Sequence, residues 1–164
     1  MKLTLSHYIL FLLCLVLPFS SGCARERCPG GLDRSVQRLR QNAERGCAEA
    51  QAILAQFALR IDNDKAFMWY SKSAEQGHPW GQHGLGVCYS FGFGVPRDEE
   101  VATKWFRKAA EQGLASSQHA LGQAYLRGYG VPKDEAEAAK WFHKAREQRD
   151  RDAAERFQRI MGRN

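Results

Sequence analysis

The sequence predicts an all-α solenoid of stacked antiparallel helix pairs, and three observations predict it. The first is an internal repeat, because residues 77–112 are identical to residues 113–148 at 20 of 36 positions. The second is the helical spacing of apolar residues within each repeat, and the third is a glycine-rich turn at its middle. Repeats of this length stack so that each unit buries its apolar face against its neighbours.

The repeat register divides the chain into six segments. The first repeat is shorter than the other two because its turn between the helices has lost residues, although both helices can remain. Polar, atypical units at the two ends are what a stacked solenoid needs to stay soluble. The segments are a signal peptide (1–22), a lead-in with an N-terminal cap helix (23–45), three repeats (46–76, 77–112 and 113–148) and a C-terminal cap helix (149–164).

The second helix of each repeat has a single apolar stripe. In the middle repeat the stripe falls at i, i+3, i+4, i+7 and i+8, which is one face of a helix: Ala102, Trp105, Phe106, Ala109 and Ala110. Asp98 precedes this helix as an N-cap, and Asp134 precedes the next one, where Glu137 completes a capping-box pattern.

The first helix of each repeat combines a small residue, a leucine and, in two repeats, a tyrosine. The small residue is Gly81 in the middle repeat and Ser117 in the last, and it lets neighbouring helices approach closely. We expect the aromatic residues of the second helix to cover this contact and to form the core of the stack.

Four glycines form the turns between the helices of the two full repeats: Gly92, Gly94, Gly128 and Gly130. A dinucleotide-binding loop needs GxGxxG after a strand, whereas here a helix precedes the glycines and Val-Pro follows them. We therefore expect turn residues with positive φ, not a phosphate site.

The strings LGxxYxxGxGVPxD and WFxKAxEQ, from residues 85–98 and 105–112, resemble Sel1-like repeats, which are relatives of tetratricopeptide repeats. The resemblance implies a non-enzymatic adaptor that presents a concave helical surface to a protein or peptide partner. It also raises a penicillin-binding or β-lactam-hydrolysing activity, but the chain contains no SxxK, KTG or GxSxG motif. Envelope glycan recognition is a third hypothesis, based on the aromatic residues Trp80, Phe93 and Tyr129.

A stripe on the first helices is the candidate partner-binding surface. Its residues avoid the positions assigned to the core, so we expect them to lie outside the packed interior. They are His83, Val87 and Ser90 in the middle repeat and His119, Gln123 and Leu126 in the last. The pair of repeat-related histidines does not predict a metal site, because parallel side chains at the spacing of stacked helices rarely converge on one ion. The sequence indicates no cofactor.

The N-terminus predicts export. Lys2 precedes an apolar run of ten residues, Tyr8 to Leu17, which is typical of a secretory signal and too short to span a bilayer as a mature helix. The residues that follow, ending in Cys23, resemble the lipobox of bacterial lipoproteins, although Ser20 stands where leucine is usual. The resemblance implies a lipid on Cys23 and outer-membrane sorting; the alternative is ordinary cleavage and a soluble exported protein.

Export makes disulfides possible. We expect either a bridge between Cys28 and Cys47 or no bridge at all.

The net charge of the chain is +6, and bases and acids are interleaved along it. The excess is too small and too dispersed to define a nucleic-acid-binding surface. We therefore expect a protein or peptide partner in the cell envelope and a membrane contact made through the lipid.

Overall fold

The structure is a computed structural model that describes the backbone of residues 32–161 and the side chains of residues 35–152. Seven helices and no strand occur in this part of the chain, which confirms the predicted all-α solenoid. The helices are α2 (Leu32–Glu44), α3 (Ala48–Ala58), α4 (Asn63–Glu75), α5 (Pro79–Phe91), α6 (Glu99–Glu111), α7 (Ala115–Arg127) and α8 (Glu135–Met161).

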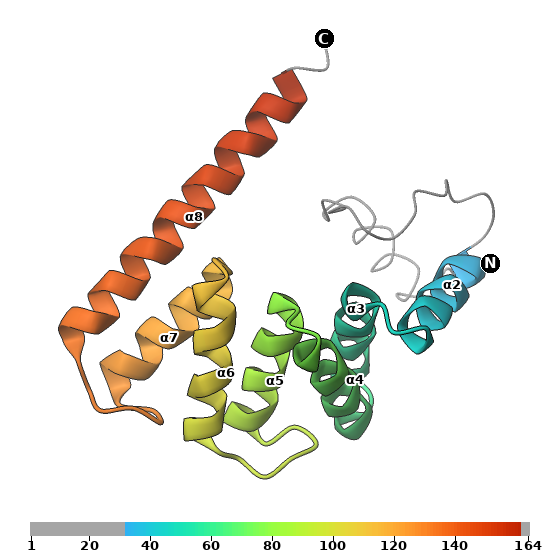
Figure 1. The fold of residues 1–164 in the computed structure, drawn as a ribbon, viewed down its shortest axis with the longest axis horizontal. Helices are drawn as coiled ribbons and strands as arrows, with labels where there is room; N and C mark the ends of the chain where they lie inside the picture. The colour runs from blue at the N-terminus through green and yellow to red at the C-terminus, as the bar shows by residue number, and fades with distance from the viewer. Residues whose placement is uncertain (1–31, 162–164) are drawn as a thin grey trace, which may run out of the picture.

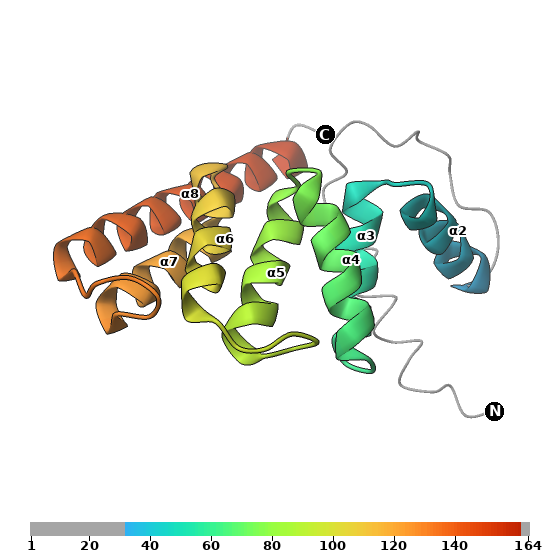
Figure 2. The same ribbon diagram turned by 60° about the horizontal axis from the view of Figure 1, so that its bottom comes forward.

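The helices form antiparallel pairs that stack side by side along one axis (Figures 1 and 2). The pairs α3/α4, α5/α6 and α7/α8 correspond to the three sequence repeats, and α2 precedes them as a single helix. At this first junction the Gln51 side chain donates a hydrogen bond from Nε2 to the Ala43 carbonyl, at 3.0 Å. The contact ties α2 to the first full pair.

Aspartates start the second helices. Asp62, Asp98 and Asp134 each accept a hydrogen bond from the backbone N–H three residues on, at 2.9 to 3.1 Å. In the last repeat the second half of the expected capping box is absent. The Asp134 N–H donates instead to the Tyr125 carbonyl, and Glu137 pairs with Lys140.

Small residues bring neighbouring helices together, as the repeat pattern predicts. A Cβ atom added at Gly81 of α5 would lie 2.4 Å from the Ser73 hydroxyl of α4, and one at Gly84 would lie 2.1 Å from the Tyr70 ring. Within the last pair, Gly122 of α7 faces the Phe142 ring of α8 in the same manner, at 2.7 Å. Side chains larger than hydrogen would push these helices apart.

The core runs along the stack as a series of alanines and aromatic residues. Tyr70, Phe106 and Trp141, one from each second helix, are buried, and Leu85 and Leu121 face them from the first helices. Their burial confirms that these aromatic residues belong to the core.

The C-terminal cap differs from the prediction. Instead of a separate helix after residue 148, α8 continues without a break to Met161. The earlier second helices are followed by Gly77 and Gly113, whose φ angles are +80° and +88°. Arg149 occupies the equivalent position in the last repeat. Because a residue with a Cβ disfavours positive φ, the turn does not form and the helix continues.

Candidate partner-binding face

The first helices, α3, α5 and α7, present one face to solvent. On α5 this face carries Trp80, Val87 and Phe91, whose spacing of seven and then four residues places them above one another on a helix. Trp80 is 50% exposed and Phe91 is 68% exposed, whereas Val87 is half-buried. The middle helix of the stack therefore has an apolar outer row, which we call the α5 row.

The two neighbouring helices carry polar residues at the repeat-equivalent positions. They are Glu49 and Gln56 on α3 with Arg60 in the turn that follows it, and Ser116, Gln123 and Arg127 on α7. Arg60 and Arg127, both exposed, are the counterparts of Phe91. An apolar centre with a polar and arginine-rich margin is the composition found in protein interfaces.

Ring contacts hold the aromatic side chains of the α5 row in place. Phe91 stacks on Phe93 with ring centroids 5.6 Å apart and an angle of 18° between the planes. The equivalent positions in the last repeat also interact, because the Arg127 guanidinium lies 5.9 Å from the centre of the Tyr129 ring. Side chains fixed in this way lose little conformational entropy on binding.

His83 is half-buried and contacts two neighbouring helices, so it lies only partly outside the packed interior. Its Nδ1 atom is 2.8 Å from the hydroxyl oxygen of Ser117 on α7, and its ring packs against Phe106 of α6 at 5.5 Å. Ser117 is fully buried. Burial lowers the pKa of His83 to about 4, so the ring is neutral at physiological pH. His83 thus joins the second repeat to the third.

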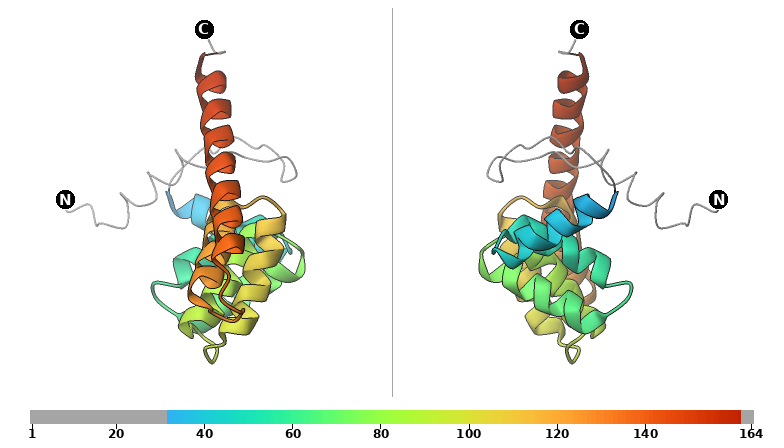
Figure 3. Two further views of the ribbon diagram at one scale, coloured as in Figure 1. Left: turned by 90° about the vertical axis from the view of Figure 1, so that its left-hand side faces the viewer. Right: turned by 90° about the vertical axis from the view of Figure 1, so that its right-hand side faces the viewer.

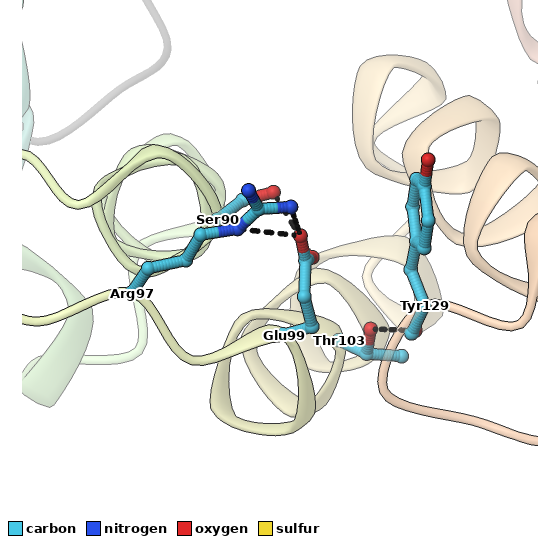
Figure 4. Close-up of polar contacts among 5 residues, drawn as sticks. All are labelled: Ser90, Arg97, Glu99, Thr103 and Tyr129. Atoms are coloured by element: carbon cyan, nitrogen blue, oxygen red, sulfur yellow. Dashed lines mark hydrogen bonds and ion pairs between the residues drawn. The ribbon is translucent and has the colours of Figure 1, made fainter.

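Ser90 also turns away from the outer row. Its hydroxyl donates to Glu99 at the start of α6, at 3.2 Å, and Arg97 pairs with the same carboxylate (Figure 4). This cluster fixes the turn after α5 to the beginning of α6. Of the three predicted residues on α5, only Val87 therefore lies in the α5 row.

The predicted residues of the last repeat are more open. His119 is exposed, with its ring 5.3 Å from Phe142, and Leu126 is 37% exposed. Gln123 is half-buried, and its Oε1 atom is buried without a hydrogen-bond partner among the described residues. The partner-binding role of all six predicted residues stays a prediction.

Sequence reasoning did not connect Trp80 and Phe91 to the predicted stripe. Both lie on the same helical face as Val87, at seven residues before it and four residues after it. This spacing was the signal in the sequence that could have identified them.

The four turn glycines all have positive φ, between 64° and 75°. Gly92 and Gly128 end the first helices in the left-handed conformation, with room for a side chain. Gly94 and Gly130 have a second constraint, since an added Cβ would lie 2.5 Å from the Asn63 carbonyl oxygen and 2.1 Å from that of Glu99. Each turn thus contacts the start of the second helix in the preceding repeat.

A hydrogen bond strengthens this contact at the last turn. The Thr103 hydroxyl of α6 donates to the carbonyl oxygen of Tyr129, at 2.9 Å (Figure 4). The turns therefore position the repeats relative to one another.

The cysteines divide into two groups. Cys23, the predicted lipidation site, and Cys28 lie outside the described residues. Cys47 precedes α3, and Cys88 lies in the core beside Tyr70. No disulfide joins Cys47 to Cys88, and burial raises the pKa of the Cys88 thiol to about 11. A thiol in this state is a poor nucleophile.

Within residues 35–152, no group of three or more His, Cys, Asp and Glu side chains is arranged to hold a metal ion. No helix in the described part of the chain is long and apolar enough to cross a bilayer.

Three segments, residues 48–78, 81–114 and 115–150, each match the Sel1 repeat. The chain belongs to the Sel1 repeat family. Sel1-repeat proteins generally act as protein-interaction adaptors and are typically not enzymes. The three matched segments fall on the helix pairs α3/α4, α5/α6 and α7/α8.

Solved structures share the fold. A protective antigen of uropathogenic Escherichia coli with an SLR fold is 39% identical, with a TM-score of 0.68; the alignment covers 72% of this chain and 26% of the antigen. A Sel1 repeat protein from Oxalobacter formigenes is 32% identical, with a TM-score of 0.66, over 76% of this chain and 99% of that protein.

The cysteine-rich protein B of Helicobacter pylori is 26% identical, with a TM-score of 0.61, over 73% of this chain and 92% of that protein. The present chain thus spans about a quarter of the length of the E. coli antigen but almost all of the other two proteins. No curated protein sequence matches the chain.

Proposed function

We propose that this protein is an adaptor of the bacterial envelope that binds a protein or peptide partner through the face formed by α3, α5 and α7. The α5 row carries the proposal, because Trp80 and Phe91 expose large apolar side chains that the fold itself does not require to be apolar. Buried tryptophan and arginine side chains supply much of the binding energy at protein interfaces.

The polar margin suits a partner with a short apolar segment. Two or three apolar side chains of the partner cover Trp80, Val87 and Phe91, and backbone or acidic groups pair with Arg60 and Arg127. Such a peptide makes several modest contacts, one for each repeat that it crosses.

We also propose that the mature protein is held at the outer membrane by a lipid on Cys23 and faces the periplasm. The apolar run before this cysteine supports the proposal. Two acyl chains anchor a protein stably, because each buried CH₂ group contributes about 0.8 kcal/mol. Metabolic labelling with a fatty-acid probe should label the wild type and not Cys23→Ser. A wild-type protein that takes up no label would contradict the proposed lipid anchor.

Site-specific crosslinking in living cells tests the adaptor function. A photoreactive amino acid replaces Trp80, Val87 or Phe91 in three variants. Two controls place it at exposed positions of the second helices, Met68 and Lys104. We expect protein adducts from the α5 row only.

Affinity measurements then test whether the contact contributes binding energy. The protein in the adduct is identified and purified, and its affinity is measured for Trp80→Ser and Phe91→Ser. We expect each variant to bind about tenfold more weakly, while Met68→Ser binds like the wild type. Adducts from the two control positions alone would contradict the assigned face, and adducts of glycan alone would favour the polysaccharide-binding alternative.

A further inference from the structure

The last repeat leaves one end of the stack uncovered in the described part of the chain. At the inner junctions the first helix of the next repeat covers the preceding pair, as Ser117 covers His83. At the end of the stack, residues at equivalent positions are exposed. His119, Ala139 and Arg146 are exposed, whereas their counterparts His83, Thr103 and Ala110 are half-buried or buried.

A hydrogen bond between two glutamines, present in the first two repeats, is missing from the last one. In the first two repeats the glutamine that directly follows the second helix donates to a buried glutamine of the first helix: Gln76 to Gln51 at 2.7 Å, and Gln112 to Gln82 at 2.8 Å. In the last repeat Gln148 donates instead to Asp152 on its own helix. The Oε1 atom of Gln118 is left buried without a partner among the described residues.

The end of α8 carries the sequence of the missing helix. Ala153, Phe157 and Ile160 are the repeat equivalents of Ser117, Leu121 and Ala124, and they keep the order of a small residue followed by apolar residues four and seven positions on. The length agrees as well, because α8 has 27 residues and each of α4 to α7 has 13. Residues 149–161 are therefore as long as one first helix.

Within its own chain this segment does not reach the open end of the stack. Figures 1 and 3 show α8 running straight past α7 and away from the body. Folding back requires the left-handed turn that Gly77 and Gly113 provide, and Arg149 stands in that place. A residue with a Cβ adopts this conformation at a cost of about 1 to 2 kcal/mol.

We propose that residues 149–161 cover the open end of a second copy of this chain, so that two copies exchange the ends of their α8 helices. Each copy donates one segment and receives one, which closes the assembly as a two-fold dimer. The donated helix takes the place on α8 that α5 has on α4 and that α7 has on α6, and it packs over the open end marked by His119, Ala139 and Arg146 of the receiving copy. The result is a domain-swapped dimer in which each exchanged helix makes the same kind of contact that joins neighbouring repeats within one chain.

A cysteine pair tests the exchange directly. The Ser73 side chain and Gly81 are in contact across an inner junction, and Ala145 and Ala153 are their equivalents. Within one straight α8 these two positions are about 12 Å apart, because a helix rises 1.5 Å per residue, and cysteines at this distance form no disulfide. The full chain with Ala145→Cys and Ala153→Cys is oxidised and compared on a non-reducing gel with the two single variants.

We expect a covalent dimer from the double variant that neither single variant forms. A bridged monomer would overturn the proposal, since it means that the segment folds back on its own chain. The absence of any bridge specific to the double variant would also overturn it.

Light scattering of the unmodified full chain gives a second test. For the wild type we expect twice the monomer mass. Phe157→Glu should raise the dissociation constant of the dimer at least tenfold. Arg159→Glu, whose position is equivalent to Val87 and Gln123, should leave it unchanged. For Arg149→Gly we expect conversion to monomer, because the turn becomes available. A wild type that is monomeric at all soluble concentrations, or a dimer that Phe157→Glu leaves unchanged, would contradict the exchange.

Discussion

His83 and His119 occupy equivalent positions in the second and third repeats, but their surroundings differ. His83 is packed against Phe106 and bonded to Ser117 of the following repeat, whereas His119 is exposed at the end of the stack. Both histidines lie close to the phenylalanine of their own second helix. The difference therefore comes from the repeat that follows, and it shows that a repeat position has no fixed environment in a solenoid.

The largest expected effect concerns the turns that join successive repeats. Gly130→Ala should lower the free energy of unfolding by about 3 kcal/mol, because it combines an unfavourable left-handed residue with a clash against the Glu99 carbonyl. Gly128→Ala should cost about 1 kcal/mol, since its Cβ has room. Urea denaturation of the two variants measures both values. Equal losses of the free energy of unfolding in the two variants would mean that the turn makes no close contact with the preceding repeat.

The second prediction is a dependence of stability on pH through His83. The unfolded chain binds this proton near the ordinary pKa of 6.5 and the folded chain only near pH 4. The contribution of neutral His83 to the free energy of unfolding is therefore fully present above pH 6.5. It is lost as the pH falls toward 4, which lowers the free energy of unfolding by at most about 3 kcal/mol. Burial also lowers the pKa of His78, so the comparison needs a variant. His83→Gln should remove most of the slope in denaturation curves taken between these pH values.

The Ser117 hydroxyl provides a smaller test of the same junction. Ser117→Ala leaves the His83 Nδ1 atom without its partner and should destabilise the protein by about 1 to 2 kcal/mol. Ser116→Ala, at the adjacent exposed position, should change the stability by less than about 0.5 kcal/mol. Thermal denaturation of the pair is sufficient. If the two alanine variants were equally stable, the hydrogen bond between the repeats would have no energetic role.

The smallest expected effect lies on the second helices, away from the junctions. The Lys108 ammonium group is 4.1 Å from the centre of the Trp105 ring, and Lys144 repeats this geometry over Trp141 at 4.1 Å. Lys108→Met should cost about 0.5 kcal/mol, as is usual for an exposed cation–π pair. A double-mutant cycle with Trp105→Leu measures the coupling. A coupling energy of zero would show that the pair only covers the ring.

Features encoded within one repeat could be predicted from the sequence. The N-cap aspartates and the helix pairs depend on neighbours that the repeat itself supplies. The continuous α8 could also have been predicted from the sequence, because Arg149 replaces the glycine that follows the other second helices. The repeat alignment concealed this signal by assigning residues 149–164 to a separate helix.

The environment of the candidate site was harder to predict. His83, Val87 and Ser90 share one broad face of α5, and spacing alone does not say which part of it meets the next repeat. That depends on how the helices cross, which places His83 against Ser117 and leaves Val87 beside Trp80 and Phe91. The functional surface is set by the packing between repeats.

The titration of the His83 ring tests the covered junction most directly. Two-dimensional NMR of the folded protein, with the resonance assigned through His83→Gln, follows the protonation of this imidazole between pH 8 and pH 4. The structure predicts that the ring stays neutral until the pH approaches about 4, because the third repeat covers it. Protonation near the ordinary pKa of 6.5 while the protein remains folded would contradict the covered junction between the second and third repeats.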